Sequence, residues 1–238
     1  MLSVGGLTIK LFADGADMDS ILALHKDPNI KGFTTNPTLM NKAGIKDYEG
    51  FSRSLLARVP DRPISLEVFA DDMESMAVQA RKIASWGKNV NVKIPITNTR
   101  GVTTAPLIHE LSKEGIVLNI TALMTLAQVQ EVAEALDPDV PAIVSVFAGR
   151  VADTGVDPVP LMQAALVALR DRPKAELLWA SPRELLNVFQ ADAIGTHIIT
   201  ATPDILNKLK LFGKDLTEYS LDTVKMFYND ATAAGFTI

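Results

Sequence analysis

Two kinds of apolar pattern alternate along the chain. Short runs rich in β-branched residues predict strands, over Leu7–Ala13, Lys31–Thr35, Ile64–Phe69, Val90–Ile96, Ile116–Thr121, Ala142–Ala148, Glu176–Ala180 and Ile194–Thr200. Longer segments between them carry apolar residues at helical spacing. The clearest is Asp72–Trp86, where Met73, Met76 and Ala80 share a face and Gly87 ends the pattern. The same spacing predicts helices over Thr103–Lys113 and Leu126–Leu136.

The number and spacing of these runs favour one fold. Eight strands in 238 residues leave about 30 residues per unit, the length of a strand with its crossover helix. Regular alternation predicts a parallel sheet with helices outside it, and eight units predict a closed (β/α)8 TIM barrel. A doubly wound open sheet is the alternative, but no G-x-G-x-x-G and no P-loop pattern occurs.

The chain carries no sign of a second domain. No linker rich in Gly, Ser or Pro divides it, so we predict a single catalytic barrel over residues 1–238. An additional C-terminal helix is predicted around residues 221–231, beyond the eighth unit. Its apolar residues share one face, so we expect it to cap its own barrel or to dock on a neighbouring copy.

Composition excludes several classes of function. The chain has a formal net charge of −5 and no block of Lys or Arg, which argues against a nucleic-acid surface. It has no cysteine, so disulfides, thiolate metal sites and a cysteine nucleophile are excluded. The three histidines show no ligand-like spacing, so no metal site is predicted. No apolar run approaches the length of a membrane helix, and we expect a cytoplasmic protein without a membrane partner.

The fourth strand carries the most informative polar residue. Val90, Val92 and Ile94 form one apolar face, so Asn91 and Lys93 point to the other face, into the barrel. An exposed lysine at a strand end is the more ordinary interpretation, but Lys93 lies mid-strand among branched residues. A lysine that loses hydration in this way keeps its neutral amine accessible. A neutral amine can attack a carbonyl carbon and form a Schiff base.

Other strands repeat this arrangement, with polar residues in their C-terminal halves at one consistent parity. These are Asp14 in the first strand, Thr34 and Asn36 in the second, Glu67 in the third, Asn119 and Thr121 in the fifth, Ser145 with Phe147 in the sixth, and Ser181 with Trp179 in the seventh. Active sites of such barrels lie at that end. Arg150 and Arg183 follow the sixth and seventh strands, where two arginines can hold an anionic group bidentately.

At these residues the sequence resembles the transaldolase family. The matching stretches are Gly32–Thr38, Asn91–Pro95, Leu118–Thr121, Ser145–Arg150 and Ala180–Arg183. They cover nearly the whole chain, and Thr-Thr-Asn-Pro together with Val-Lys-Ile-Pro is specific to this family. The resemblance implies a (β/α)8 barrel with class I aldol chemistry that needs no metal or cofactor. It also implies a homo-oligomer, such as a pentamer or a decamer.

The resemblance assigns roles to the polar residues. Lys93 corresponds to the Schiff-base lysine, and Asp14 to the acid/base that takes the C4 hydroxyl proton as the C3–C4 bond breaks. Glu67 corresponds to the general acid/base of imine formation, working through a water that Thr121 holds. The implied substrate-binding residues are Thr34, Asn36, Asn119, Ser145, Phe147 and Ser181, with Arg150 and Arg183 as a phosphate clamp.

The implied reaction moves a dihydroxyacetone unit from a ketose phosphate, such as fructose 6-phosphate or sedoheptulose 7-phosphate, to an aldose phosphate. The short subfamily that this chain resembles also contains fructose 6-phosphate aldolases, so a lyase is the first alternative. Those lyases carry Tyr and Gln where this chain has Phe147 and Glu67, which favours transfer. A second alternative is transfer from another anionic sugar, such as a sulfonated ketose. Pro182 stands where the family often has an aromatic residue.

Overall fold

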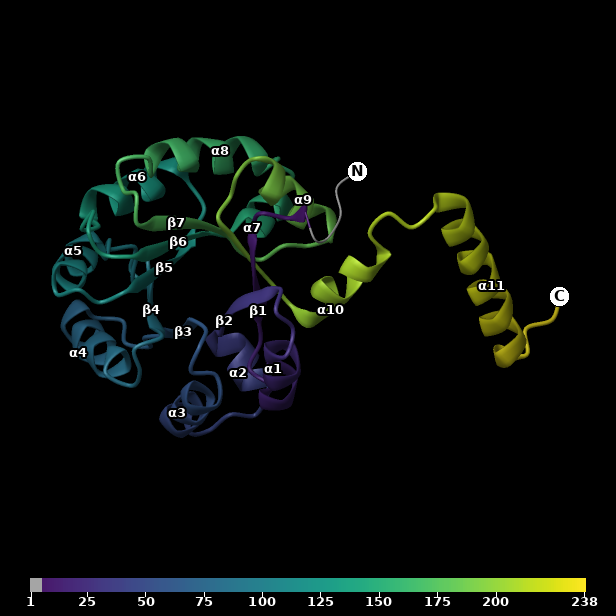
Figure 1. Cartoon of the computed structure of the whole chain (residues 1–238), viewed down its shortest axis with the longest axis horizontal. Coiled ribbons are helices and arrows are strands. Elements are labelled where there is room, and N and C mark those ends of the chain that lie inside the picture. Colours follow the sequence, from purple (N-terminus) through teal and green to yellow (C-terminus); the bar gives the residue numbers. More distant parts are fainter. Residues whose placement is uncertain (1–5) are drawn as a thin grey trace.

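The computed structural model describes residues 6–238, and their central element is a closed parallel barrel in which each strand pairs with its neighbours in chain order. Figure 1 shows the barrel with its helices around the outside. The strands are β1 Lys10–Asp14, β2 Ile30–Thr34, β3 Ile64–Glu67, β4 Val90–Pro95, β5 Leu118–Leu123, β6 Ala142–Val146, β7 Ala175–Trp179 and β8 Ile198–Ala201. The predicted (β/α)8 fold is confirmed.

Helices α1 to α9 lie between successive strands around the barrel, and α10 and α11 follow the last strand. They are α1 Met18–His25, α2 Pro37–Lys42, α3 Tyr48–Arg58, α4 Met73–Ala84, α5 Ala105–Lys113, α6 Leu126–Ala135, α7 Ala148–Asp153, α8 Val159–Ala168, α9 Leu186–Ala193, α10 Pro203–Leu206 and α11 Leu216–Ala234. A 3₁₀ helix, Asn207–Leu211, follows α10. No helix within residues 6–238 combines the length and apolar character that crossing a membrane requires.

The sequence pattern explains where individual helices begin. Helix α4 begins after Asp72, whose carboxylate accepts a hydrogen bond from the Ser75 backbone N–H at 2.8 Å. Helix α6 begins with a capping box, in which Thr125 and Gln128 each accept a hydrogen bond from the other's backbone N–H. Each cap satisfies backbone donors that have no partner within the helix.

Every strand differs from its predicted range at one end or both, and three of these differences coincide with a particular local structure at the strand end. Strand β1 begins at Lys10 rather than Leu7, because the Asp192 carboxylate accepts hydrogen bonds from the backbone N–H groups of Thr8 and Ile9. Strand β8 begins at Ile198 because residue 194 caps α9 and Gly195, with φ of 80°, makes the turn that follows. Strand β5 continues to Leu123, past Ala122 in the left-handed region.

Apolar residues fill two separate regions of the barrel. The larger core lies between the strands and the surrounding helices and includes Trp179, which is fully buried. A small cluster lies apart from it on the other face of the strands, and it comprises Phe12, Ile143, Leu178, Ala180 and Ile198. Because side chains alternate along a strand, this inner cluster forms the floor below the polar C-terminal end of the barrel.

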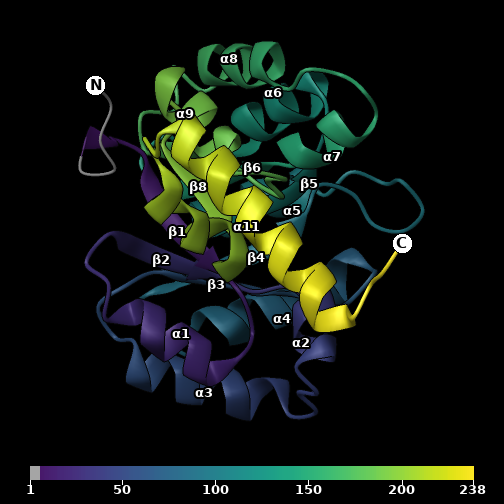
Figure 2. The same cartoon turned by 90° about the vertical axis from the view of Figure 1, so that its right-hand side faces the viewer.

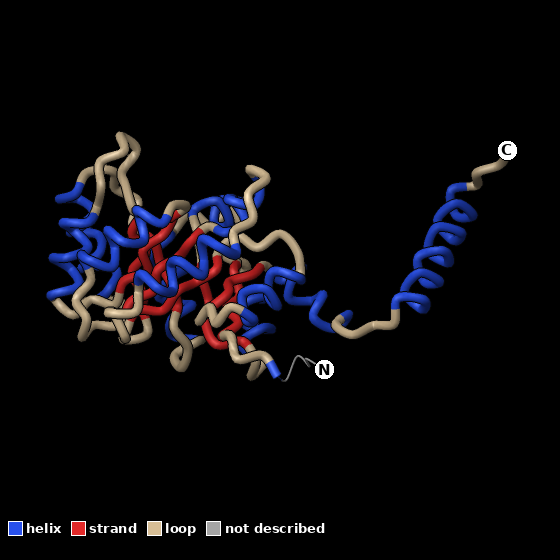
Figure 3. The backbone as a smooth tube through the Cα atoms, turned by 90° about the horizontal axis from the view of Figure 1, so that it is seen from above, coloured by secondary structure: helices blue, strands red, loops and turns tan. Residues whose placement is uncertain are grey.

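The C-terminal arm, residues 212–238, leaves the barrel. Figures 1 and 3 show α11 standing away from the rest of the molecule at the end of an extended loop, and in Figure 2 it faces the viewer. None of the residues of α11 is buried. The helix therefore does not cap its own barrel in this structure, which was one of the two arrangements expected from the sequence.

Candidate active site

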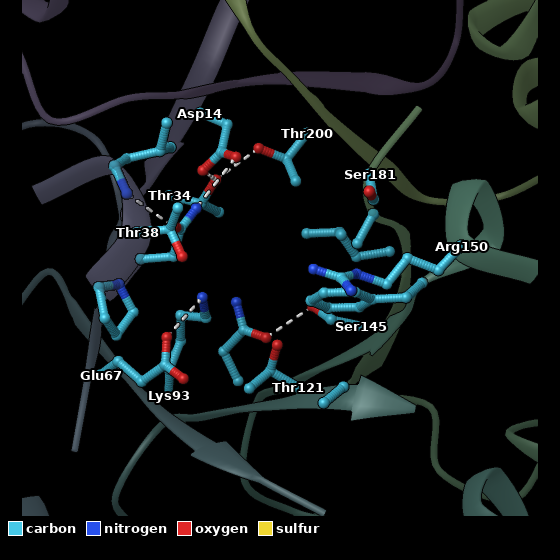
Figure 4. Close-up of a pocket in the computed structure, with 18 of the residues that line it drawn as sticks. Asp14, Thr34, Thr38, Glu67, Lys93, Thr121, Ser145, Arg150, Ser181 and Thr200 are labelled. Atoms are coloured by element: carbon cyan, nitrogen blue, oxygen red, sulfur yellow. Dashed lines mark hydrogen bonds and ion pairs between the residues drawn. The ribbon is translucent and has the colours of Figure 1, made fainter. Parts of the chain in front are cut away.

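A polar cavity of about 450 Å³ opens at the C-terminal ends of the strands. All twelve of the sequence-predicted site residues line it: Asp14, Thr34, Asn36, Glu67, Lys93, Asn119, Thr121, Ser145, Phe147, Arg150, Ser181 and Arg183. Strand register explains part of this convergence, since Glu67 pairs with Lys93 and Lys93 with Asn119 across neighbouring strands. Figure 4 shows Lys93 and Glu67 on one side of the cavity and Arg150 on the opposite side.

Lys93 is held at the base of the cavity by two acceptors. Its Nζ donates to the Thr35 carbonyl oxygen at 2.9 Å and lies 3.0 Å from Glu67 Oε2. Its side chain is only 8% exposed. Burial with paired acceptors orients the amine toward the cavity and leaves it little contact with bulk water. The amine and the Glu67 carboxylate are close enough for direct proton exchange.

Asp14 is the second carboxylate near the amine and has a different environment. It accepts hydrogen bonds from Thr34 Oγ1 at 2.7 Å and from Asn36 Nδ2 at 3.4 Å. Thr34 in turn lies 2.6 Å from the hydroxyl of Thr200. Burial raises the pKa of Asp14 above its ordinary value of 3.8, although the charge of Lys93 and these hydrogen bonds act in the opposite direction. A carboxylate with a raised pKa is a stronger base.

A chain of hydrogen bonds runs across the third side of the cavity. Ser145 Oγ donates to Asn119 Oδ1 at 2.7 Å, and Asn119 Nδ2 donates to Ser65 Oγ at 2.9 Å. These bonds fix which end of the Asn119 amide faces each neighbour. By contrast, the buried Thr121 hydroxyl has no hydrogen-bond partner among the described residues. A buried hydroxyl of this kind is available to a water or a substrate oxygen.

The two arginines have different partners at the far side of the cavity. The Arg150 guanidinium lies over the Phe147 ring, 5.7 Å from its centroid. Arg183 instead donates from Nε and Nη2 to the two carboxylate oxygens of Asp153, with the Nε–Oδ1 distance 2.9 Å. The sequence pattern placed both arginines at this end but carried no signal for Asp153.

The seventh strand corrects one prediction. Trp179 was expected to share the inward face with Ser181, but it is fully buried in the outer core, while Leu178 and Ala180 line the cavity. Ser181 still reaches the cavity because its φ of 60° lies in the left-handed region and reverses the alternation just past the strand. Such a conformation is strained for a residue with a Cβ and is commonest at functional sites.

Sequence reasoning missed several residues around the cavity. Thr200 lines it at the inward parity of β8, a signal that was present in the sequence. The Thr35 carbonyl, which holds Lys93, is a backbone group that no residue pattern reveals. Tyr48 donates to the Glu67 carbonyl oxygen at 3.0 Å from α3, across a tertiary contact. Residues 6–238 contain no group of three or more potential metal ligands.

The arrangement is suited to chemistry on a carbonyl compound. A buried primary amine can attack a carbonyl carbon, and two carboxylates with different surroundings can move protons on either side of it. Across the cavity, two guanidinium groups can bind an anionic end of the same molecule.

Comparisons with known proteins identify the family of the chain. A model of the family described as Transaldolase/Fructose-6-phosphate aldolase matches residues 11–238. The chain is 34% identical to a "Probable transaldolase" of Dehalococcoides mccartyi, over 84% of this chain and 90% of that protein. It is also 34% identical to a "Probable transaldolase" of Streptococcus equi subsp. zooepidemicus, over 93% and 97%.

A solved structure from Burkholderia cenocepacia, called a "putative lyase/mutase", matches with a TM-score of 0.61 at 14% identity, over 94% of this chain and 88% of that one. At that identity it supports the barrel fold alone. The family match spans nearly the whole chain, and it covers every residue that lines the cavity. The chain belongs to the Transaldolase/Fructose-6-phosphate aldolase family.

Proposed function

We propose that the protein is a transaldolase that moves a dihydroxyacetone unit from a ketose phosphate to an aldose phosphate through a Schiff base on Lys93. The observation that carries the proposal is the Lys93 amine, buried at the base of the cavity between the Thr35 carbonyl and Glu67. Among the described residues, no other lysine lines this cavity. Fructose 6-phosphate and sedoheptulose 7-phosphate are the donors that we propose.

The first half of the reaction forms the imine. The neutral Lys93 amine attacks the C2 carbonyl of the donor, and the resulting carbinolamine loses water to give an iminium. Glu67 supplies and recovers the protons for this exchange, with a water held by the Thr121 hydroxyl as carrier. The 3.0 Å separation of Lys93 Nζ from Glu67 Oε2 supports the role of Glu67, and the Thr121 hydroxyl, which has no partner within residues 6–238, supports the role of Thr121.

The second half breaks the carbon–carbon bond. Asp14 takes the proton of the C4 hydroxyl, the C3–C4 bond breaks, and its electron pair moves into the iminium to leave an enamine. The aldehyde product departs, an aldose phosphate takes its place, and the same steps run in reverse. The raised pKa of Asp14 makes it a stronger base for this step. The hydrogen bonds across Ser145 and Asn119 are positioned to hold the hydroxyls of the three-carbon unit.

A donor screen with borohydride trapping tests the proposal. Reduction in the presence of fructose 6-phosphate should add one covalent adduct, seen by intact mass and mapped to Lys93. Lys93→Met should abolish the adduct, whereas Lys113→Met, a control on the exposed end of α5, should not. An adduct on another lysine, or persistent trapping in Lys93→Met, would refute the Schiff-base role.

The lyase alternative is separated by the need for an acceptor. Phe147 lines the cavity with a ring that carries no hydroxyl to help a water protonate the enamine. We therefore expect turnover of fructose 6-phosphate to require an aldose phosphate such as erythrose 4-phosphate. Rapid release of dihydroxyacetone without an acceptor would make the protein a lyase of the fructose 6-phosphate aldolase type.

A further inference from the structure

The anion end of the cavity carries a carboxylate that the proposed mechanism does not use. This residue is Asp153, the last residue of α7. Its two carboxylate oxygens accept hydrogen bonds from Nε and Nη2 of Arg183. Asp153 is not among the residues that line the cavity. Arg183, by contrast, is one of the lining residues.

This ion pair reduces the number of hydrogen-bond donors and the net positive charge that the two arginines offer to a ligand. A guanidinium has five donors, so Arg183 keeps one edge for a ligand after Asp153 has bound the other. Arg150 has no ion-pair partner among residues 6–238 and stands over the Phe147 ring. The group of Arg150, Arg183 and Asp153 therefore carries one net positive charge rather than two.

Within the described part of the chain, no other charged residue that lines this end of the cavity or an adjoining hollow restores the second positive charge. Asp204 lines that hollow together with Arg183, which adds a further negative charge. The opposite side of the cavity holds Asp14, Glu67 and Lys93. The hydrogen bonds from Arg183 hold the pKa of Asp153 below its usual range, and the charges of Arg183 and Arg150 act in the same direction. Asp153 is therefore ionised at neutral pH.

We propose that Asp153 positions Arg183 and reduces the net positive charge at the anion end of the cavity to one at most, matching it to a sugar whose end group carries a single negative charge. A sulfonate, or a phosphate that holds one proton, has this charge. This inference rests on the proposed function and deepens it, since it concerns the substrate class of the same site. A doubly charged phosphate still binds, but Asp153 lowers its advantage over a singly charged group.

The test compares end groups that differ in charge. The donors are fructose 6-phosphate well above its second phosphate pKa of about 6, 6-deoxy-6-sulfofructose, which is singly charged, and neutral fructose. In Asp153→Asn, one negative charge is lost and the side-chain shape is kept. The ratio of kcat/KM for phosphate over sulfonate should rise about three- to sixfold at low salt, the size expected for one added charge across a solvated pocket.

Two further variants separate charge from structure. Asp153→Glu keeps the charge and should leave the ratio as in the wild type. Asp171→Asn removes an exposed carboxylate before β7, at the other end of that strand, and should also leave it unchanged. In Asp153→Asn the gain for the phosphate donor should come from a lower KM rather than a higher kcat, and it should shrink with added salt. The kcat/KM for neutral fructose should not change. An unchanged ratio in Asp153→Asn, or an equal rise in Asp153→Glu, would overturn the inference.

A binding measurement separates this inference from the proposed function. Should the wild type turn over none of the three donors, the proposed function fails. The inference is then read from thermal shifts with inorganic phosphate at pH 8 and with methanesulfonate. Asp153→Asn should strengthen phosphate binding relative to methanesulfonate by the same factor. Equal effects on both anions, or no binding of either anion, would refute the inference.

Discussion

Asp14 combines two requirements that oppose each other. Its carboxylate must be close enough to Lys93 to act on the bound donor, and the same location removes it from water. Burial raises its pKa despite the hydrogen bonds from Thr34 and Asn36. In the native state the protonated form is therefore favoured more than in the unfolded chain. The stability that this gives is present below the ordinary pKa of 3.8 and is lost as pH rises through the raised value.

Asp14→Asn should therefore stabilise the protein at pH 7 and inactivate it. We expect Tm to rise by about 2–4 °C, equivalent to on the order of 1 kcal/mol, and kcat to fall by roughly 10²- to 10⁴-fold. As pH falls toward the ordinary pKa of 3.8, the gain in Tm should shrink, because protonation of the wild-type carboxyl in the native state removes the cost of burying its charge. Thermal melts across pH, with steady-state kinetics, measure both effects.

Asp17→Asn is the matched control, since it makes the same change three residues away. Asp17 is an exposed cap of α1 whose pKa is lowered by its hydrogen bonds with Ser20. Its contribution to stability is present above the ordinary pKa and is lost as pH falls, so this variant should not gain stability at pH 7. A lower Tm for Asp14→Asn at pH 7 than for the wild type would mean that the carboxylate has a structural role.

Residues whose parity follows the strand period could be predicted from the sequence. Lys93, Asn119 and Ser145 all lie in strands, and each reaches the cavity as alternation requires. Residues that depend on a tertiary contact could not. Asp153 matters only because the loop after β7 brings Arg183 to it, from 30 positions away in the chain. The backbone conformation that brings Ser181 into the cavity could not be predicted either, since the sequence Ala-Ser-Pro does not indicate a left-handed φ at the serine.

At the scale of elements, α7 and the loop after β7 touch more closely than any side chain permits. A Cβ on Gly149 would lie 1.5 Å from the Ser181 carbonyl oxygen. The Gly149 backbone N–H also donates to the Ala180 carbonyl at 3.3 Å. This contact joins the two segments that carry Arg150 and Arg183. The strained Ser181 conformation is thus supported by a backbone that only glycine can provide.

Gly149→Ala should force these two segments apart. The clash involves backbone atoms on both sides, so relief requires a shift of the loop and with it of Ser181 and Arg183. We expect a loss of several degrees in Tm, or failure to fold, and a larger loss of kcat/KM for phosphorylated donors than for fructose in any folded protein. Circular dichroism melts and steady-state kinetics provide the readouts.

Gly15→Ala serves as the comparison. An added Cβ there meets nothing within 4 Å, so its Tm should stay close to that of the wild type. A Gly149→Ala protein that melts like the wild type and treats both donors alike would show that the loop has room to move.

The elements themselves were well predicted because apolar periodicity reports burial. All eight strands were anticipated, and the errors lie at their ends, where particular tertiary contacts decide. The Asp192 carboxylate occupies the backbone donors of Thr8 and Ile9, and a carboxylate 184 positions away from Thr8 leaves no trace in local sequence.

The whole molecule has one feature that a lone barrel does not explain, the C-terminal arm. Large apolar side chains on α11 are exposed, with Val224 at 60%, Phe227 at 63% and Tyr228 at 71%. A helix of this kind gains most of its stability from packing of its apolar face. Because no residue of α11 is buried against its own barrel, we propose that this helix packs on a second copy of the chain, in line with the expected homo-oligomer.

Replacement of Phe227 by Glu should therefore reduce the assembly. We expect the wild type to be larger than 25.7 kDa, the mass of one chain, and Phe227→Glu to shift toward that mass. Asn229→Glu adds the same charge on the opposite face of α11 and should leave the assembly intact. Light scattering after size exclusion measures both. A wild type that is monomeric at all concentrations would refute the arm's proposed partner.

Closure of the barrel has a consequence for how the protein is made. Strand β8 pairs with β1, so the ring is complete only once residues near 201 are available. Residues 202–238 follow and carry the arm. At 5–20 residues per second, a ribosome needs roughly 2–7 s to add them. Every strand of the barrel is thus synthesised before the helix that would join it to another subunit, so assembly through α11 can begin only after the whole barrel sequence has been made.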